Sequence, residues 1–456
     1  MKTKVVIIGG VAAGPKIMAK LLRTKEFDCQ IDLYTEENMI SYSACGLPYY
    51  IEGIIKDFNK LIVRRPEQFE ELGANIHLNK RCTKILPAEH KIIIEDTKTG
   101  IIQTVEYDKL AITTGARPIL PPIKNIGLEN VFTVRHLQDG INIRNKILDP
   151  NTKNAVIIGG GYIGIEILEA FFLNNIHTHL IEMNEHILSI FDSEISDIIK
   201  DEIIKMSNGL VEITTSDAVI ELQGNGKVEQ VITQSGKIIE TDLVVICVGV
   251  TPNTEIAKDA GIELGISNAI RVNNRMQTNK DNIYAAGDCV ENFHLVSKNY
   301  CWIPLGSSAN KEGRCAAINI AGAYDAFPGV LGSAVTRYDG MTISLTGLNE
   351  KEAKKHGFDV ISATMTKKDK AGYMPEAENI TIKLVVDKRS KKILGAQAIG
   401  CGDADKRINT VASAIQADQT VTEFLNLDMT YAPPFSTAID PLLSAALVIN
   451  NKIFSS

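Results

Sequence analysis

The chain has 456 residues, of which 45% are hydrophobic, and its formal net charge at pH 7 is −7. This length and apolar content are enough to bury the cores of two or three domains. The acidic balance argues against a nucleic-acid-binding protein, and no apolar run reaches the roughly 20 residues that a membrane span needs. The first predicted strand begins at residue 4, which leaves no room for a signal peptide, so we expect a cytoplasmic protein without a membrane partner.

The first motif is a strand, a glycine turn and a helix. Residues 4–8 (Lys-Val-Val-Ile-Ile) have the pattern of a short buried strand, and a helical pattern runs from Pro15 to about Arg23. Such a turn lets a pyrophosphate approach the N–H groups and the positive dipole end of the helix. The copy is imperfect because Val11 stands where the second glycine of the fingerprint belongs. The turn itself consists of Gly9, Gly10, Val11, Ala12, Ala13 and Gly14.

Cys45 lies in the run Ser41-Tyr42-Ser43-Ala44-Cys45-Gly46-Leu47-Pro48-Tyr49-Tyr50. Tyr50 stands where a dithiol redox pair would have its second cysteine. A single thiol can alternate only between a thiolate and a bond to something external, such as a mixed disulfide, a persulfide or a sulfenic acid. Pro48 is typical of a first helical turn, so we expect a helix N-terminus to lower the pKa of Cys45. The alternative is a buried, inert cysteine.

A second, complete glycine motif follows about 150 residues later. A strand over 154–158 leads into Gly159-Gly160-Gly161-Tyr162-Ile163-Gly164, and helical periodicity continues to Leu173. The next strand, 177–182, ends on Glu182. A carboxylate there accepts hydrogen bonds from ribose hydroxyls and repels a 2′-phosphate, and no Arg or Lys lies between His177 and Ile199. The pattern therefore predicts NADH rather than NADPH; the alternative for Glu182 is a solvated charge at a strand end.

The later segments add a third nucleotide element and a change of pattern. Residues 282–288 form a strand that ends in Gly287-Asp288, and this aspartate can hold the ribityl chain of FAD. Strand-to-glycine turns at Thr114-Gly115 and at Gly249 mark the passages between two nucleotide-binding domains. From about residue 330 the pattern changes to strands with polar turns, over 342–345, 380–386 and 393–399.

The eight cysteines show no CxxC spacing, which argues against zinc, an iron–sulfur cluster and a disulfide framework and fits a reducing compartment. Cys247 and Cys315 lie in apolar runs and are expected to be packed. The cysteines are Cys29, Cys45, Cys82, Cys247, Cys289, Cys301, Cys315 and Cys401.

On the run around Cys45 and the late Tyr431-Ala432-Pro433-Pro434-Phe435-Ser436, the chain resembles the FAD-dependent pyridine nucleotide-disulfide oxidoreductases. Within them it resembles the single-cysteine branch of coenzyme A-disulfide reductases, NAD(P)H persulfide reductases and NADH oxidases. The resemblance implies an α/β fold with two Rossmann-like dinucleotide-binding domains and a C-terminal α+β dimerisation domain in a homodimer. The predicted boundaries are 1–118 with 250–325 for FAD, 119–249 for NAD, and 330–456 for dimerisation.

The resemblance also assigns the cofactor contacts. The FAD ribose needs an acid after the strand 30–34, where Thr35 stands with Glu36 beside it, so either residue can take this role. Glu166 faces the nicotinamide, unless it is a simple helix N-terminal charge. The implied cofactor-binding residues are Gly9, Gly10, Val11, Ala12, Ala13, Gly14, Thr35, Glu36, Thr114, Gly115, Gly159, Gly161, Tyr162, Ile163, Gly164, Glu166, Glu182, Gly249, Gly287, Asp288 and Ala309.

The resemblance places Tyr373 and Tyr431 across the dimer, near the partner's Cys45, where a phenol can donate a proton to a departing thiolate. The alternative is that both tyrosines only pack at the interface. The last histidine is His356, so the histidine that dithiol relatives carry near the C-terminus is missing. Ala12 stands where oxidases and peroxidases of the branch carry a histidine, which favours a sulfur substrate over oxygen.

The sequence thus predicts an FAD enzyme that uses NADH to reduce a coenzyme A disulfide, a persulfide or a polysulfide through Cys45. Lys16, Lys20 and Arg23 on one helical face, with Arg64 and Arg65, would receive the phosphates of coenzyme A, or else form a solvated charged face. Two alternatives stay open. One is an NADH oxidase that reduces oxygen at the flavin, and the other is an electron-transfer flavoprotein that serves a protein partner.

Overall fold

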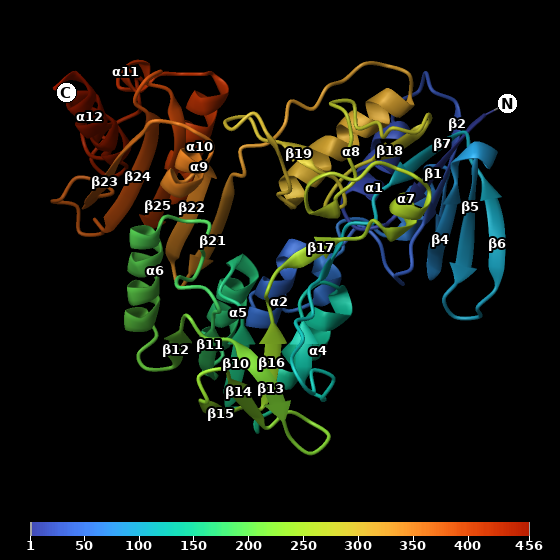
Figure 1. Cartoon of the computed structure of the whole chain (residues 1–456), viewed down its shortest axis with the longest axis horizontal. Coiled ribbons are helices and arrows are strands. Elements are labelled where there is room, and N and C mark those ends of the chain that lie inside the picture. The colour runs from blue at the N-terminus through green and yellow to red at the C-terminus, as the bar shows by residue number, and fades with distance from the viewer. Residues whose placement is uncertain (1, 456) are drawn as a thin grey trace.

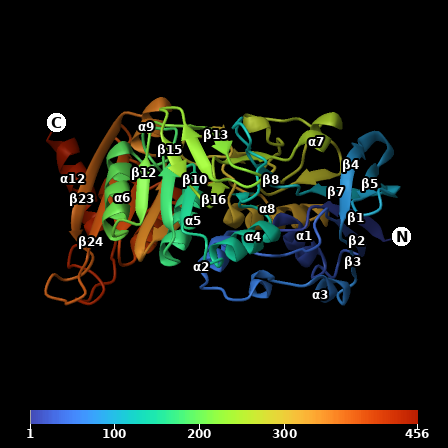
Figure 2. The ribbon, with the colours of Figure 1, turned by 90° about the horizontal axis from the view of Figure 1, so that it is seen from below.

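The computed structural model describes residues 2–455. The chain forms three parts (Figure 1): blue and gold segments at the upper right, green segments below, and the orange and red C-terminal part at the upper left. Seen from below, the green part lies between the C-terminal and N-terminal ends of the molecule (Figure 2). Within the described residues, no helix has both the length and the apolar character needed to cross a membrane.

The first parallel sheet joins segments that are far apart in the sequence. Its strand order is β18-β7-β1-β2-β3, and β18 pairs with β7 although about 170 residues separate them. This pairing brings the late Gly-Asp segment to the edge where the first glycine turn lies. The strands are β1 (Thr3–Ile8), β2 (Cys29–Tyr34), β3 (Ala74–His77), β7 (Lys109–Ile112) and β18 (Ile283–Ala285), and the packed helices are α1 (Ala13–Leu21) and α8 (Gly306–Ile320).

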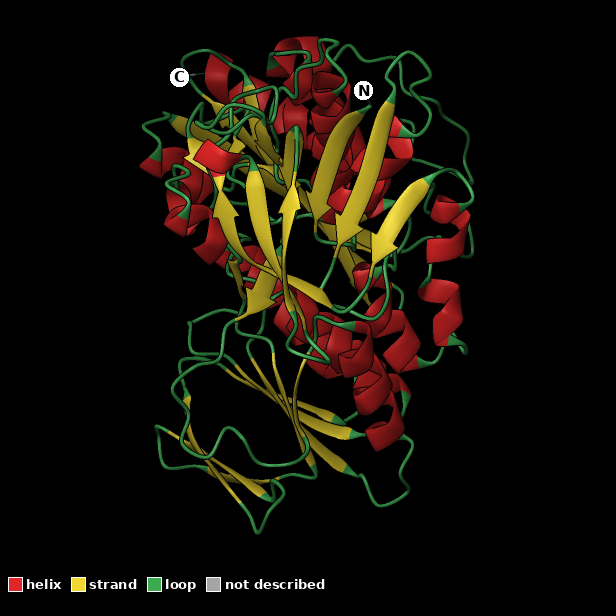
Figure 3. Cartoon of the chain, turned by 90° about the vertical axis from the view of Figure 1, so that its right-hand side faces the viewer, coloured by secondary structure: helices red, strands yellow, loops and turns green. Residues whose placement is uncertain are grey.

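The second parallel sheet repeats this arrangement in the green part. Its order is β12-β11-β10-β16-β9, and helices lie beside the sheets in both parts (Figure 3). The apolar residues of the central strands of both sheets are buried, as their apolar runs predict. The strands are β9 (Val131–Thr133), β10 (Asn154–Ile158), β11 (His177–Ile181), β12 (Val211–Thr214) and β16 (Leu243–Ile246), and the helices are α4 (Leu137–Ile147), α5 (Tyr162–Leu173) and α6 (Ser193–Met206).

Short antiparallel sheets flank the two parallel ones. A two-stranded pair, β8 (Ala116–Pro118) with β17 (Val250–Pro252), lies directly after the predicted glycine turns. Further short helices are α2 (Leu47–Glu52), α3 (Pro66–Glu70) and α7 (Glu255–Asp259). The remaining strands outside the C-terminal part are β4 (Lys80–Leu86), β5 (Lys91–Asp96), β6 (Ile102–Glu106), β13 (Val219–Gln223), β14 (Gln230–Thr233), β15 (Ile238–Glu240), β19 (Asn292–Phe293) and β20 (Tyr300–Cys301).

The C-terminal part is a five-stranded antiparallel sheet with helices, and its order is β21-β22-β25-β24-β23. The three predicted strands all fall within it. Two Rossmann-like domains and a C-terminal α+β domain confirm the predicted fold class. The strands are β21 (Ala334–Tyr338), β22 (Met341–Gly347), β23 (Val360–Lys368), β24 (Asn379–Asp387) and β25 (Ile393–Gly400); the helices are α9 (Glu350–Lys355), α10 (Ala404–Gln416), α11 (Val421–Phe424) and α12 (Pro441–Phe454).

Helix α2, which follows Cys45, packs against the second nucleotide-binding domain rather than its own. Leu47 and Ile51 of α2 share a buried apolar cluster with Ile165 and Leu168 of α5, and α2 lies beside α4 and α5 in Figure 1. Tyr50 is buried and contacts Phe58 edge to face. The position of the missing second cysteine is therefore a packing position, and Cys45 lies where the two nucleotide-binding domains meet.

Candidate active site

A single cleft with a volume of about 1870 Å³ contains both glycine turns and Cys45. This volume exceeds the roughly 300–1,000 Å³ of an ordinary small-ligand pocket, so there is room for two dinucleotides. The predicted site residues that line the cleft are Gly9, Gly10, Val11, Ala12, Ala13, Thr35, Glu36, Cys45, Thr114, Gly115, Gly159, Gly161, Tyr162, Ile163, Glu166, Glu182, Gly249, Gly287, Asp288 and Ala309.

The two turns have the same backbone geometry. Gly9 and Gly159 adopt φ of 106° and 104°, and a Cβ on either would collide with a carbonyl oxygen, at 2.1 Å from Thr113 and 2.5 Å from Cys247. Only glycine adopts such a positive φ readily and also lacks the Cβ that would collide. Val11 and Gly161 stand at the matching third position, which has no positive φ, so valine is tolerated in the first copy.

Gly14 and Gly164 differ from the other glycines of the two turns, because neither lines the cleft. A Cβ at Gly14 would lie 2.0 Å from the carbonyl oxygen of Gly9, and one at Gly164 would lie 2.1 Å from that of Gly159. These glycines allow each helix to pack closely on its strand. They shape the turn without lying on the cleft surface.

The residues present fit dinucleotide cofactors. A Cβ at Gly161 would meet nothing within 4 Å, so open space lies directly over the N-terminus of the 12-residue helix α5. Backbone N–H groups at such a terminus attract a pyrophosphate. Glu182 is buried at the end of β11, where its Oε2 accepts a hydrogen bond of 2.7 Å from the N–H of Gly160. Its Oε1 accepts from the backbone and side chain of Asn184.

Thr35 in the first nucleotide-binding domain occupies the position that Glu182 occupies in the second. Tyr34 pairs with Ile8 in the first sheet and Ile181 pairs with Ile158 in the second, so the next residues are Thr35 and Glu182. Thr35 is buried, whereas Glu36 is exposed and forms an ion pair of 2.8 Å with Arg81.

Asp288, which follows β18, also has a cationic partner. Its carboxylate lies 3.1 Å from Arg135, a residue that sequence reasoning did not identify. The preceding Gly287 donates its N–H to Glu312 at 2.7 Å. Glu312 is fully buried on α8, and burial raises its pKa to about 7. Ala309 lies one turn earlier, where its Cβ would face that of a substituted Gly287 at 3.6 Å.

Cys45 lies in a 3₁₀ turn, Ala44–Gly46, immediately before α2. It is exposed to the cleft, but surrounding protein withdraws its thiol from bulk water. This desolvation, with the carboxylates of Glu166 and Asp288, raises the pKa of Cys45, and Arg135 opposes the shift. The direction is opposite to the one we expected, because the nearby charges and desolvation outweigh a helix of only six residues.

Glu166 shares the cleft with Cys45. Desolvation and the neighbouring Glu169 raise the pKa of Glu166 to about 7, and Thr336 opposes this by donating a hydrogen bond to Oε1 at 3.5 Å. Glu169 is paired instead with Arg337, 3.2 Å away. The guanidinium of Arg337 also binds both oxygens of Glu52 on α2, at 2.9 and 3.0 Å. Sequence reasoning missed Arg337, because its partners lie in other domains.

Tyr373 and Tyr431 lie on two neighbouring loops of the C-terminal domain, away from the cleft lining of the same chain. The backbone N–H of Ala371 bonds to the carbonyl of Pro433 at 3.2 Å and joins the loops. Both tyrosines are largely exposed, at 74% and 53%. A single chain therefore does not bring either tyrosine to its own Cys45.

Part of the predicted basic group lines the cleft. Lys16, Arg23 and Arg64 belong to its wall, whereas Lys20 and Arg65 do not. The guanidinium of Arg64 stacks over Phe69, 4.9 Å from the ring centroid.

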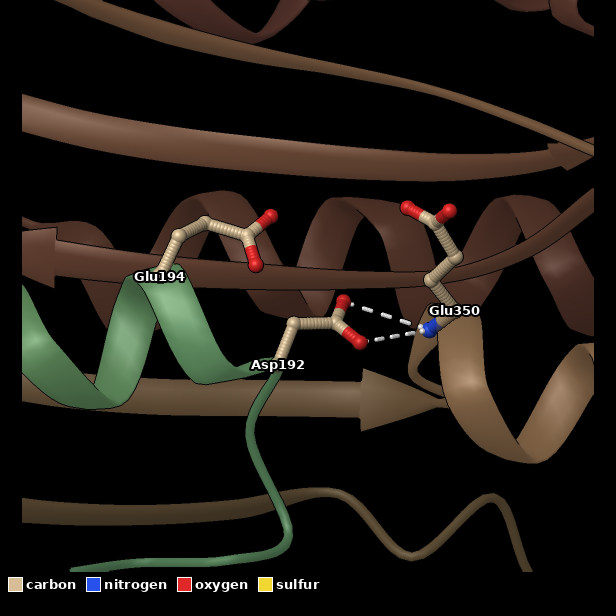
Figure 4. Close-up of side chains that lie close together, drawn as sticks. All are labelled: Asp192, Glu194 and Glu350. Carbon is tan, nitrogen blue, oxygen red and sulfur yellow. Dashed lines mark hydrogen bonds between the residues drawn. The ribbon is translucent and has the colours of Figure 1, made fainter. Parts of the chain in front are cut away.

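Asp192, Glu194 and Glu350 gather where α6 meets the C-terminal domain (Figure 4) and form a group with the spacing of metal ligands. The ammonium of Lys383 binds all three, at 2.9 Å from Asp192, 3.0 Å from Glu350 and closer still to Glu194. The ammonium of Lys383 thus occupies the position that a metal ion would take among these carboxylates. All eight cysteines are free, and Cys247 and Cys315 are buried as predicted.

Comparison with known proteins agrees with this architecture. The family described as pyridine nucleotide-disulphide oxidoreductase matches residues 3–313, and its dimerisation domain matches residues 333–442. The chain is 38% identical to a Pyrococcus horikoshii protein named NAD(P)H coenzyme A polysulfide/persulfide reductase, over 98% of this chain and 99% of that protein. It is 33% identical to an NADH oxidase of Methanocaldococcus jannaschii, over 97% and 98% of the two chains.

A solved structure agrees as well. The NAD-dependent persulfide reductase of A. fulgidus has a TM-score of 0.95 and 34% identity, over 99% of this chain and 84% of that one. With two fingerprint turns, Cys45 on the wall of the same cleft and matches along nearly its whole length, the chain belongs to the pyridine nucleotide-disulphide oxidoreductase family, whose members are enzymes that use a flavin and a pyridine nucleotide.

Proposed function

We propose that this protein is an FAD-dependent NADH oxidoreductase that reduces a small sulfur compound through Cys45. The observation that carries the proposal is the position of Cys45, which is exposed on the wall of the cleft that also contains both glycine turns, whereas Cys82 and Cys247 on the same lining are buried. Its relatives named for persulfide and polysulfide reduction support a sulfur acceptor. We take the domain boundaries predicted from the sequence as part of the proposal, together with a cytoplasmic homodimer.

The pyridine nucleotide is proposed to be NADH, held at Gly159, Gly161 and Glu182. Glu182 is fixed by the N–H of Gly160 and by Asn184, so its carboxylate is oriented to accept ribose hydroxyls and to repel a 2′-phosphate. FAD, held at the first turn and near Asp288, supplies the two-electron step between nicotinamide and sulfur. The protein orients the flavin and the nicotinamide relative to each other.

Cys45 acts as the nucleophile. Its thiolate attacks a sulfur of the substrate and forms a mixed disulfide while the other sulfur leaves as a thiolate. Tyr373 and Tyr431 of the partner subunit donate a proton to that leaving group. Their exposure on adjoining loops supports this role, because these side chains are free to reach a second chain.

The substrate is proposed to be linked to coenzyme A, as a disulfide, a persulfide or a polysulfide adduct. Lys16, Arg23 and Arg64 line the wall of the cleft, and cationic side chains bind phosphates. A nucleotide-bearing thiol needs such a basic wall, whereas oxygen does not.

The test is anaerobic stopped-flow absorbance of the NADH-reduced protein, mixed separately with coenzyme A disulfide, coenzyme A persulfide and oxygenated buffer. We expect rapid flavin reoxidation by a sulfur compound, lost in Cys45→Ser and kept in the control Cys29→Ser. Cys29 begins β2 and lies outside the cleft lining. Rapid reoxidation by oxygen alone would make the protein an NADH oxidase, and turnover with a protein acceptor that survives Cys45→Ser would make it an electron carrier.

A further inference from the structure

Gly306 is the first residue of α8 and lies on the wall of the cleft beside Cys45. A Cβ built on Gly306 would lie 3.6 Å from Sγ of Cys45. Outside its own helix turn and chain neighbours, no other atom of the described residues would lie within 4 Å of that Cβ. The space that this glycine leaves empty therefore borders the redox sulfur.

The backbone does not demand glycine at this position. Gly306 is helical and has no positive φ, unlike Gly9 and Gly287. Glycine is a poorer helix former than alanine, so the local structure would be satisfied by a side chain. Packing does not demand glycine either, because 3.6 Å is an ordinary contact distance and no backbone atom approaches. The feature that glycine does provide at this position is open space beside Sγ of Cys45.

Thiol exchange at Cys45 needs space beside the sulfur. The thiolate attacks a disulfide R–S–S–R′, the bond from Sγ to the sulfur of R forms, the S–S bond of the substrate breaks, and R′S⁻ leaves with the electron pair. The new S–S bond is about 2.05 Å long, and its C–S–S–C dihedral angle is near 90°. The R group therefore projects sideways from the Sγ–S bond, whereas a sulfenate adds a single oxygen with no substituent.

We propose that Gly306 is a specificity-determining residue, whose absent side chain gives the carbon-bearing sulfur of a mixed disulfide room beside Cys45. It thereby favours organic disulfides over peroxide. This inference rests on the proposed function, because it takes Cys45 as the thiol that reacts with substrate. A methyl group 3.6 Å from Sγ would touch the free thiol without strain, but it would crowd any sulfur bonded to Sγ on the side of α8.

The test compares two reactions of Cys45 in the NADH-reduced holoenzymes of wild type, Gly306→Ala and Gly306→Val. We expect the second-order rate constant with coenzyme A disulfide to fall about tenfold in Gly306→Ala and further in Gly306→Val, as overpacking by one or more methyl groups predicts. The rate constant with hydrogen peroxide should stay within about twofold, because one oxygen needs little space. Intact-mass spectrometry identifies the mixed disulfide and the sulfenate.

Gly127→Ala is the matched control, because Gly127 is exposed, lacks a positive φ and has nothing within 4 Å of its missing Cβ. Unchanged rates with coenzyme A disulfide in Gly306→Ala would overturn the inference, as would an equal slowing with peroxide. Loss of flavin absorbance from the purified variant would also overturn it, because the space would then belong to the cofactor. Turnover of coenzyme A disulfide by Cys45→Ser refutes the proposed function itself.

Discussion

Glu166 and Cys45 are two acidic groups on one cleft wall, and each charge disfavours the other. Desolvation raises both pKa values, that of Glu166 to about 7. Asp288 and Arg135 also act on the thiol, in opposite directions. Below pH 7 Glu166 is largely protonated and neutral, so its repulsion of the Cys45 thiolate grows as the pH rises through 7. The protonation of one residue is thus linked to that of the other.

We expect Glu166→Gln to lower the pKa of Cys45, because the neutral amide no longer repels a thiolate. Alkylation of Cys45 by iodoacetamide should become roughly fivefold faster at pH 8, the factor that about 1 kcal/mol of charge repulsion gives. The difference should shrink below pH 6. Peptide mass spectrometry over pH 5–9 follows the reaction, with Glu185→Gln on the exposed loop after β11 as the control. A pH profile identical to that of wild type would contradict the linkage.

Substitutions of Thr35 and of Glu36 are expected to have different effects on FAD binding. Thr35 is buried at the position that matches Glu182, whereas Glu36 is exposed and engaged by Arg81. We expect Thr35→Val to weaken FAD binding about tenfold, as the loss of one hydrogen bond predicts, and Glu36→Gln to change it by less than about twofold, as for an exposed ion pair. Titration of each apoprotein with FAD, followed by flavin fluorescence, distinguishes them. A larger loss in Glu36→Gln would assign the ribose contact to Glu36.

At the scale of elements, an ion pair joins α2 to the C-terminal domain. Arg337 on β21 binds Glu52 of α2 and Glu169 of α5, and it stacks over Tyr49, 5.3 Å from the ring centroid. The turn that carries Cys45 therefore depends on the C-terminal domain as well as on its own sheet.

A second junction joins α6 to the C-terminal sheet through Lys383. The lysine is buried on β24 and forms ion pairs with three carboxylates, so Lys383→Met leaves the buried carboxylate of Asp192 without a cationic partner. We expect a loss of about 3–5 kcal/mol in the free energy of unfolding, measured by urea denaturation. Lys355→Met, at an exposed lysine on α9, should change stability by less than about 1 kcal/mol. Equal stability of both variants would show that the cluster contributes nothing to the junction.

At the scale of the whole molecule, the site needs two chains if the tyrosines act across the dimer. We expect a chain with Cys45→Ser and a chain with Tyr373→Phe and Tyr431→Phe to be nearly inactive as homodimers. A heterodimer of the two should regain about half of the wild-type turnover per dimer, because one site then combines an intact cysteine with the partner's intact tyrosines. Differently tagged chains allow the heterodimer to be purified and assayed. An inactive heterodimer would place the tyrosines with the cysteine of their own chain.

The sequence by itself determined the strands that lead into the two glycine turns, the turns themselves and the cysteine without a redox partner at residue 50. Gly9 and Gly159 need φ near +105° and contact a neighbouring strand, and these short-range steric demands are written in a few adjacent residues. The same local information identified the residues of the two turns that line the cleft and also Glu182, whose place follows from its distance along the chain from the turn.

Only the tertiary structure decided how the site is charged and how much room it has. Cys45 meets Gly306, Glu166 and Asp288, residues that lie more than 100 positions away in the sequence. Desolvation, together with the two carboxylates, reverses the pKa direction expected from the short helix. Arg337 and Lys383 likewise find their partners in other domains. Desolvation and Coulomb interactions depend on distances through space, and no local sequence pattern contains those distances.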